Sequence, residues 1–363
     1  MIIKSLELTD YRNYDHLNIE FDSGTNIFYG DNAQGKTNIL EALYIAATTK
    51  SHKGSRDSEI IRFGHDEAHI RTVVENDGIP TRVDMHLRSS KTKGIAIDGN
   101  RIKKAAELMG LCKVVFFSPE DLNIVKNGPS YRRRFIDMEL CQLDQFYLYN
   151  LNNYNKILNR RNQVLKDMYF DKGLEESLSV WDDQLISYGT KIIERRRKFS
   201  DELEEQIKEV HSKLSGGREE ISIIYEPSVR EEDFESCLKS SRARDMKSKA
   251  TAIGPHRDDF AFMTGDIDIR KFGSQGQQRT AALSLKLSEI DMMKKLSGDN
   301  PILLLDDVLS ELDRKRQGFL LDSIGDIQTF ITCTGIDDFV NDRFVINRVF
   351  YVENGTVTQK SDS

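Results

Sequence analysis

Uninterrupted apolar runs near the carboxyl end of the chain predict strands that are buried on both faces. Such runs occupy residues 302–305 and 329–332, and a strand covered on both sides carries no polar alternation. Near the amino end, residues 26–29 form another short apolar run, and a glycine and a helical pattern over 36–47 follow it. This stretch predicts strand, loop and helix. The first eight residues also predict a strand.

Alternating runs fill residues 68–117 and predict antiparallel strands with one wet face. Val83, Met85 and Leu87 point to one side, and Ile95 and Ile97 repeat the pattern after a turn. Strict alternation of apolar and polar residues is typical of a sheet that packs on the core with only one face.

The interval 130–226 contains no proline, and proline costs about 3 kcal/mol inside a helix. It carries an apolar stripe at steps of three and four residues, formed by Phe199, Leu203, Ile207, Val210 and Leu214. We therefore predict a subdomain of a few long helices here. The basic residues at 191 and 195–198 are expected on its solvent face, and the polar, basic segment 240–249 is expected to be a loop or linker.

Composition narrows the class of protein. The chain has 363 residues and a formal net charge of −7, which excludes a wholly basic DNA coat but leaves a local basic face open. No stretch approaches the roughly 20 apolar residues of a membrane span, and the first residues do not resemble a signal peptide. The four cysteines form no CxxC pair, so we expect reduced thiols and a cytoplasmic protein with no membrane partner.

The strongest chemical signal is the loop between the predicted strand at 26–29 and the predicted helix at 36–47. It reads Gly-Asp-Asn-Ala-Gln-Gly-Lys-Thr and fits the phosphate-loop pattern G-x-x-x-x-G-K-[ST]. Its glycines allow a tight turn that points N–H groups at phosphate oxygens, and the helix N-terminus adds roughly half a positive charge. We predict nucleotide binding by Gly30, Asp31, Asn32, Ala33, Gln34, Gly35, Lys36 and Thr37.

Acidic residues supply the second signal, because the apolar run 302–305 ends in Asp306 and Asp307. Lys36 is predicted to reach the β- and γ-phosphates, while Thr37 and Asp306 hold Mg²⁺ and Asp307 polarises the attacking water. Alternatively, the two carboxylates only cap the next helix. The two motifs lie near opposite ends of the chain, so they meet only if both ends fold into one sheet and the helical interval is an insertion.

A third signal is the turn Ser-Gln-Gly-Gln at 274–277, directly before an alanine- and leucine-rich helix. Alone, this turn is equally consistent with a serine that merely caps the helix. A phosphate loop and an acidic strand end in the same chain favour a second phosphate-reading turn, with Ser274, Gly276 and Gln277 as its candidate nucleotide contacts.

In their order along the chain, the phosphate loop, the turn at 274–277, the acidic strand end and Ser-Glu-Leu-Asp at 310–313 resemble the Walker A, signature, Walker B and D-loop motifs of ABC-type ATPases. Longer stretches resemble the bacterial RecF family over nearly the whole chain. These are Leu-Thr-Asp-Tyr-Arg-Asn-Tyr at 8–14, Thr-Thr-Lys-Ser-His-Lys at 48–53, Phe-Ser-Pro-Glu-Asp-Leu at 117–122, Gly-Pro-Ser-Tyr-Arg-Arg-Arg at 128–134, Gly-Pro-His-Arg-Asp-Asp at 254–259 and Gly-Ser-Gln-Gly-Gln-Gln-Arg at 273–279.

The resemblance implies an α/β fold, an ABC-type P-loop ATPase head similar to the heads of SMC proteins. It would be built from an N-terminal part (1–120) and a C-terminal part (251–363), with a helical lobe (121–250) inserted between them. It also implies a head-to-tail homodimer around two ATP molecules that binds DNA in the ATP state and helps RecO and RecR load RecA at single-strand gaps.

Individual residues receive roles by the same resemblance. Ser274 would touch the γ-phosphate held by a second subunit, Arg12 and Asn13 would lie near the nucleotide, and Asp313 would cross the dimer interface. Residues 117–122 would be the counterpart of the Q-loop.

The chain departs from the transporter pattern in three places: Gln275 replaces the first signature glycine, Asp307 replaces the usual glutamate, and 332–334 contains no switch histidine. The shorter Asp307 side chain fits slow hydrolysis and a switch rather than a motor.

Contacts to DNA are less defined by the sequence. Lys53 and Arg56 follow the first helix and are candidate phosphate contacts, with a solvated loop as the alternative. The arginine run 132–134 either binds DNA or pairs with Asp137 and Glu139. His256 and Arg257 either approach the nucleotide or form a structural turn. No module for sequence-specific readout is visible, so contacts to the DNA backbone are expected.

With the nucleotide motifs, the resemblance to the RecF family implies an ATP-gated DNA-binding protein of recombinational repair and replication, with a weak DNA-stimulated ATPase that serves as a conformational switch. Double-stranded and gapped DNA, RecR and RecO are the expected partners, and RecA an indirect one. The alternative is a repair scaffold of the same fold that does not hydrolyse ATP. A transporter ATPase is disfavoured by the helical lobe, and a small-molecule kinase would not need the signature turn.

Overall fold

The computed structural model describes residues 1–168, 172–335 and 346–360, and the chain divides into two units. Unit 1 comprises Met1–Asp121 and Glu289–Ser363, and unit 2 comprises Leu122–Ser288. Both ends of the chain therefore belong to one unit, and the other unit is inserted between them.

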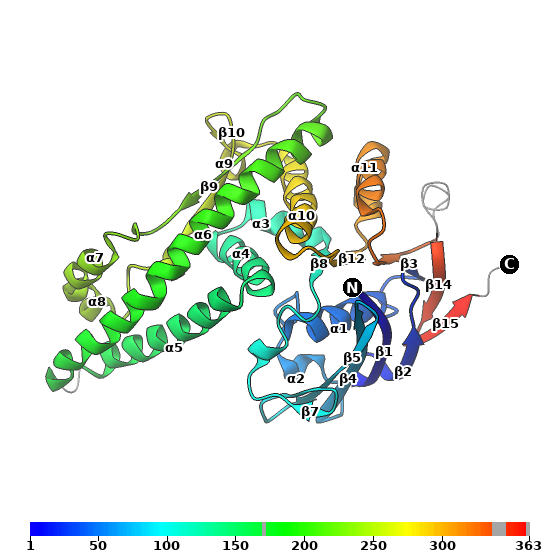
Figure 1. The fold of residues 1–363 in the computed structure, drawn as a ribbon, viewed down its shortest axis with the longest axis horizontal. Coiled ribbons are helices and arrows are strands. Elements are labelled where there is room, and N and C mark those ends of the chain that lie inside the picture. Colours follow the sequence, from blue (N-terminus) through cyan, green and yellow to red (C-terminus); the bar gives the residue numbers. More distant parts are fainter. Residues whose placement is uncertain (169–171, 336–345, 361–363) are drawn as a thin grey trace. The chain divides into compact units, whose positions relative to one another are not determined.

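A mostly parallel sheet in unit 1 has the strand order β15-β14-β3-β13-β12-β8, so it combines strands from both ends of the chain. In Figure 1 the blue β3 lies beside the red β14, with which it pairs in parallel. Every residue of β8 and β12 is buried, as expected of strands covered on both faces. The prediction of an antiparallel strand with one wet face is therefore wrong for Val114–Phe117, which pairs in parallel with β12. The strands are β3 (Thr25–Tyr29), β8 (Val114–Phe117), β12 (Ile302–Asp306), β13 (Thr329–Cys333), β14 (Ile346–Glu353) and β15 (Thr356–Lys360), which confirms those predicted from apolar runs.

The second sheet of unit 1 is antiparallel, with the order β2-β1-β4-β5-β6-β7. Its strands are β1 (Ile2–Tyr11), β2 (Tyr14–Glu20), β4 (Glu67–Asn76), β5 (Ile79–Arg88), β6 (Gly94–Ile97) and β7 (Asn100–Arg101). Val83, Met85 and Leu87 are buried and the residues between them are not, which confirms the predicted wet face. Helix α1 (Lys36–Thr48) contacts strands of both sheets and is almost entirely buried.

Shorter elements complete unit 1. They are α2 (Asp57–Ile60), η1 (Ala105–Glu107), η2 (Pro119–Asp121), η5 (Leu309–Glu311) and α11 (Arg314–Ile324). None of the helices within the described ranges carries the long apolar stretch that crossing a membrane requires.

Unit 2 is built around two long helices, α5 (Gln145–Asp167) and α6 (Leu178–Ser215), which run side by side in Figure 1. The predicted apolar stripe from Phe199 to Leu214 is buried on α6. The other elements are α3 (Leu122–Lys126), α4 (Pro129–Leu143), η3 (Lys172–Ser177), α7 (Phe234–Ser240), α8 (Arg242–Ser248), η4 (Pro255–Arg257), α9 (Ile269–Phe272) and the first part of α10 (Gln275–Ser297). The residues of α10 from Glu289 onward belong to unit 1. A small sheet of β9 (Ser222–Glu226), β10 (Asp259–Thr264) and β11 (Ile267–Asp268) is also present.

The structure differs from the predicted division of the chain after residue 250. Unit 2 continues to Ser288 because β10 pairs with β9 and α4 packs on β10. Sequence patterns could not show this long-range pairing. The predicted loop at 240–249 is wrong, since most of it forms α8. That helix is held by the buried Asp245 carboxylate, which accepts a hydrogen bond from Arg161 at 2.7 Å.

Arg196 corrects the prediction of an entirely wet basic face. Its side chain is 2 % exposed and donates to Asp137 at 2.8 Å and to Asp258 at 3.0 Å. Arg132, for which the sequence leaves DNA binding or pairing with Asp137 and Glu139 open, pairs with Asp259 at 2.7 Å. Buried guanidinium groups need such carboxylate partners, and all three partners lie in segments that are remote in sequence from the arginine they bind.

Candidate nucleotide site

The loop that joins β3 to α1 has a backbone that side chains would not permit. Gly30 and Gly35 have φ angles of +147° and +116°. A Cβ atom on Gly35 would lie 2.5 Å from Nδ2 of Asn13 and 2.8 Å from the Tyr14 hydroxyl. Only glycine fits there, and the resulting turn opens the N-terminus of α1 toward an anion. Asp31, Asn32 and Ala33 are exposed at the tip of the loop.

Lys36 lies across this loop with 6 % of its surface exposed. Its Nζ donates to the carbonyl oxygens of Gly30 and Asp31, both at 2.7 Å. Burial lowers the pKa of Lys36, and the carboxylates of Asp307 and Asp306 act in the opposite direction. The ammonium group is thus held by weak neutral acceptors that phosphate oxygens could replace with stronger, charge-assisted bonds.

Thr37 and Asp306 bring the two ends of the chain into contact. The Thr37 hydroxyl donates to Oδ1 of Asp306 at 2.7 Å, and Thr332 donates to the same oxygen at 2.8 Å. Asp306 ends β12 and Thr332 lies opposite it on the parallel β13. A hydroxyl and a carboxylate side by side are hard oxygen ligands of the kind that Mg²⁺ prefers, so the donor set fits this ion.

Asp307 adopts a left-handed backbone conformation with φ +53°. Its N–H donates to the Thr332 side chain at 3.0 Å, and Ser310 donates to the Asp307 carbonyl at 2.7 Å and to its carboxylate at 3.2 Å. A non-glycine residue in this region costs on the order of 1–3 kcal/mol. The surrounding hydrogen bonds hold it there.

Thr332 is the residue of this site that the sequence prediction missed. In the sequence it is only part of a segment without a switch histidine, yet in the structure its side chain bonds to both Asp306 and Asp307. The available signal was its position at the end of an apolar run. Neighbouring parallel strands place their carboxyl ends at the same edge of the sheet, which brings Thr332 beside Asp306.

Asn13 and Arg12 differ in their relation to the loop. Asn13 donates to the Gln34 carbonyl at 2.9 Å and accepts from Asn38 at 2.8 Å, so it supports the loop directly. Arg12 instead forms two hydrogen bonds of 2.8 Å with Glu41 of α1. Burial raises the pKa of Glu41, but the hydrogen bonds from Arg12 and Ser51 outweigh it and the pKa is lowered.

The turn before α10 belongs to unit 2. The Ser274 N–H donates to Oε1 of Gln277 at 2.9 Å, and the Gln277 N–H donates to the Ser274 hydroxyl at 3.2 Å. This reciprocal pair caps the helix. Ser274 and Gly276 are exposed, and Gln277 also reaches Glu219 at 3.2 Å.

The remaining candidates have more modest surroundings. Lys53 and Arg56 are exposed between α1 and α2. Asp313 accepts from the Arg316 N–H at 3.0 Å and begins α11, and this hydrogen bond lowers the pKa of Asp313. Nε2 of His256 donates to the Thr251 carbonyl at 3.0 Å, so Nδ1 of the neutral ring accepts from the Tyr154 hydroxyl at 2.7 Å. His256 therefore forms a structural turn within unit 2.

Comparison with known proteins adds an independent result. A model of the RecF/RecN/SMC N-terminal domain matches residues 2–358. The DNA replication and repair protein RecF of Agathobacter rectalis is 59% identical over 357 residues, which cover 98% of this chain and 99% of that protein. RecF of Lachnospira eligens is 56% identical over 363 residues, covering 99% of this chain and all of that protein (100%).

Solved structures agree with this result. The structure described as the recombination mediator protein RecF-ATP in the RecFOR pathway is 34% identical, with a TM-score of 0.93, and the match covers 99% of this chain and 97% of that one. The Smc head domain of Pyrococcus furiosus matches with a TM-score of 0.56 and 17% identity, covering 99% and 96% of the two chains. That likeness shows the fold alone, an ABC-type α/β ATPase head, as predicted.

Proposed function

Because this chain belongs to the RecF family of DNA replication and repair proteins, we propose that it is an ATP-gated DNA-binding protein of recombinational repair that hydrolyses ATP to reset itself. The observation that carries this proposal is the 2.7 Å contact between Thr37 and Asp306. It joins a phosphate loop to an acidic strand end, which is the minimum apparatus for binding and cleaving a nucleoside triphosphate.

The residues of unit 1 have distinct tasks in this mechanism. The loop from Gly30 to Thr37 binds the phosphates of ATP through its N–H groups, and Lys36 exchanges its two carbonyl partners for phosphate oxygens. Thr37 and Asp306 would hold Mg²⁺, which supplies neutralisation of the charge that develops on the phosphates. Asp307, which directly follows Asp306 and has a left-handed backbone conformation, orients the attacking water.

A second copy of the chain completes the site in this proposal. Its exposed Ser274, at the N-terminus of α10, donates to the γ-phosphate, with Gly276 and Gln277 beside it, and Asp313 lies at the interface. Hydrolysis removes charge-assisted hydrogen bonds that only the triphosphate makes with both copies, so the dimer opens.

DNA binding follows from the same cycle. Lys53 and Arg56 are exposed cations that suit contacts to the DNA backbone. In the closed state the protein would hold double-stranded and gapped DNA at junctions and, with RecO and RecR, help load RecA. The relative described as a recombination mediator of the RecFOR pathway supports this role. The free cysteines of the described residues are consistent with the cytoplasm as its compartment.

Sedimentation of the full chain with and without ATP tests the gate. We expect ATP to shift the parent from monomer to dimer, and Ser274→Arg to remain a monomer. Ser236→Arg is the matched control, because Ser236 is also an exposed serine of unit 2 and lies on a different helix. A Ser274→Arg protein that dimerises like the parent would overturn the mechanism.

Phosphate release measured with gapped DNA separates the switch from a scaffold that does not hydrolyse ATP. We expect DNA to raise the rate of the parent well above that of Lys36→Ala. Equal rates for the two proteins would favour the scaffold.

A further inference from the structure

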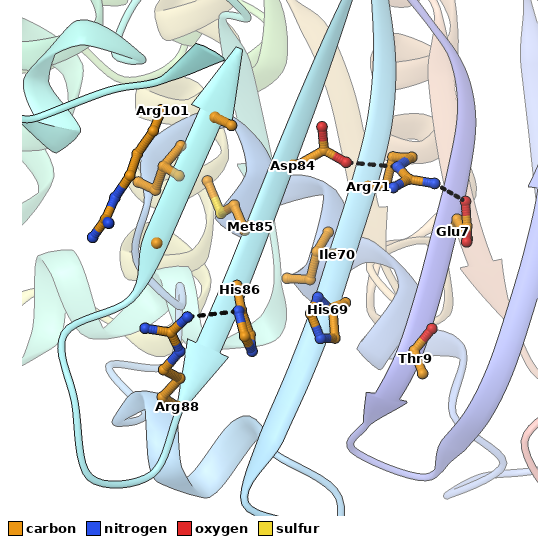
Figure 2. A pocket seen from close by; sticks show the side chains of 13 residues that line it. Glu7, Thr9, His69, Ile70, Arg71, Asp84, Met85, His86, Arg88 and Arg101 are labelled. Atoms are coloured by element: carbon orange, nitrogen blue, oxygen red, sulfur yellow. Dashed lines mark hydrogen bonds and ion pairs between the residues drawn. The ribbon is translucent and has the colours of Figure 1, made fainter. Parts of the chain in front are cut away.

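The solvent face of the antiparallel sheet carries a cluster of side chains that the nucleotide site does not use. On β4 and β5 the register pairs His69 with His86 and Glu67 with Arg88. Because side chains alternate along a strand, these four residues share one face, opposite the buried Ile70. Figure 2 shows His69, His86 and Arg88 at a cavity of about 380 Å³ on this face.

The two histidines are arranged face to face. Their ring centroids are 4.1 Å apart with an interplanar angle of 22°, and Nε2 of His86 lies 2.7 Å from Oε2 of Glu67. One ligand atom from each of Glu67, His69 and His86 lies within 4.8 Å of the other two. Within the described part of the chain, the His69 imidazole has no hydrogen-bonding partner. It stacks on its neighbour with its nitrogens unengaged.

We propose that Glu67, His69 and His86 form a binding site for a divalent transition-metal ion of the Zn²⁺ class, with water completing the coordination. Two imidazoles and one carboxylate are a common three-ligand set for this ion, which accepts a fourth ligand from solvent. Zn²⁺ binds nitrogen and oxygen ligands at about 2.0–2.2 Å, so the three ligand atoms must move slightly closer to one another to reach a common ion. Glu67 and His69 are exposed and His86 is half-buried, so small changes of rotamer can do this.

Arg88 opposes the metal in this arrangement. Its guanidinium donates to Nδ1 of His86 at 3.0 Å, and since arginine only donates, Nδ1 must be the accepting nitrogen and Nε2 must carry the proton. A metal bound at Nε2 moves that proton to Nδ1, which then faces the arginine. Arg88 must therefore swing away, and its charge disfavours the cation until it does.

Titration of the full-length, nucleotide-free chain with Co²⁺, followed by displacement with Zn²⁺, tests the site through the visible absorption of bound Co²⁺. We expect one ion per chain at this site, and at least about tenfold weaker binding in His69→Gln and His86→Gln. His65→Gln is the matched control, because His65 also lies beside a carboxylate, Asp10 at 3.2 Å. It should bind Co²⁺ like the parent.

Arg88→Gln gives a second readout that a general loss of folding could not produce. Removal of the opposing cation should tighten Co²⁺ binding several-fold. The proposal is overturned if the double variant His69→Gln/His86→Gln binds Co²⁺ like the parent, or if Asp306→Asn, and not the histidine variants, abolishes binding. Weaker binding in Arg88→Gln would also contradict it.

Discussion

Two helix N-termini of this chain, both proposed to bind phosphate, are built in different ways. Helix α1 begins after Gly35, is buried, and carries no side-chain cap among the described residues. Helix α10 begins after Ser274, is exposed there, and is capped reciprocally by Ser274 and Gln277. The N-terminus of α1 leaves its backbone N–H groups free for a ligand inside a preformed loop. The N-terminus of α10 pairs one of its N–H groups with the Ser274 side chain, and Ser274 is exposed to solvent.

The difference between the two termini suits two different roles in the proposed dimer. A terminus that is wrapped by its own unit can bind phosphate strongly and with little reorganisation. A terminus that is already capped binds weakly by itself, and it adds affinity only when another copy delivers a phosphate to it. Four experiments probe this contrast.

Substituting the glycine at each terminus should give the largest difference. Gly35→Ala places a Cβ atom 2.5 Å from Asn13 at φ +116°, so we expect ATP affinity to fall by at least about a thousandfold, because backbone strain and a clash add together. In Gly276→Ala the nearest atom to the new Cβ is 3.8 Å away, the Ser274 hydroxyl oxygen. This variant should bind ATP like the parent.

Fluorescent ATP binding and urea unfolding distinguish the two variants. Gly276→Ala should be as stable as the parent or gain up to about 1 kcal/mol, since alanine is favoured over glycine within a helix. If Gly35→Ala still bound ATP at parental affinity, ATP binding at the N-terminus of α1 would not depend on the backbone conformation of Gly35. The proposed contrast between the two termini would then be wrong.

Asp307→Asn should separate binding from hydrolysis in unit 1. Asparagine tolerates the left-handed backbone at φ +53° at least as well as aspartate, so the fold and ATP binding should persist. Without a carboxylate to orient water, hydrolysis should slow by about a hundredfold, or roughly 2.7 kcal/mol of barrier. Single-turnover phosphate release measures this rate. Unchanged hydrolysis would remove Asp307 from the reaction.

Acid should destabilise unit 2 through His256. Burial is the main reason that the pKa of His256 is lowered to about 4, and the neutral ring bonds to Tyr154 and Thr251. The unfolded chain binds this proton near the usual pKa of 6.5. Between the two values the unfolded state holds more protons, so stability is complete above pH 6.5 and is lost as the pH falls toward 4.

Urea unfolding at pH 7 and pH 5 measures the effect. This single group should remove about 2 kcal/mol of stability at pH 5. The same comparison in His256→Gln should show a smaller pH dependence by that amount. An equal slope in both proteins would mean that another group dominates the acid response.

The sequence predicts the features that depend on local motifs and misses those that depend on contacts between distant segments. The strand, loop and helix around Gly35 and the acidic strand at Asp306 were predictable because each motif is local and its periodicity is strong. Thr332 as a partner of Asp306, and Arg196 as a buried ion-pair residue, were not, because each role is fixed by contacts with distant segments. The helix at Asp245 was missed for the same reason, since its carboxylate is buried against Arg161.

The smallest expected effect separates the two roles of Ser274. Ser274→Ala removes the cap of α10, which should cost about 1 kcal/mol in urea unfolding, and it also removes the proposed contact with the partner's phosphate. Ser274→Asp keeps a side-chain acceptor for the Gln277 N–H, so its stability should match that of the parent, but its negative charge would repel the phosphate. If capping were the only role of Ser274, the aspartate variant would dimerise with ATP normally, and the alanine variant would dimerise less well than the aspartate variant. If the turn reads a partner's phosphate, the order reverses, with Ser274→Asp stable but monomeric in sedimentation with ATP.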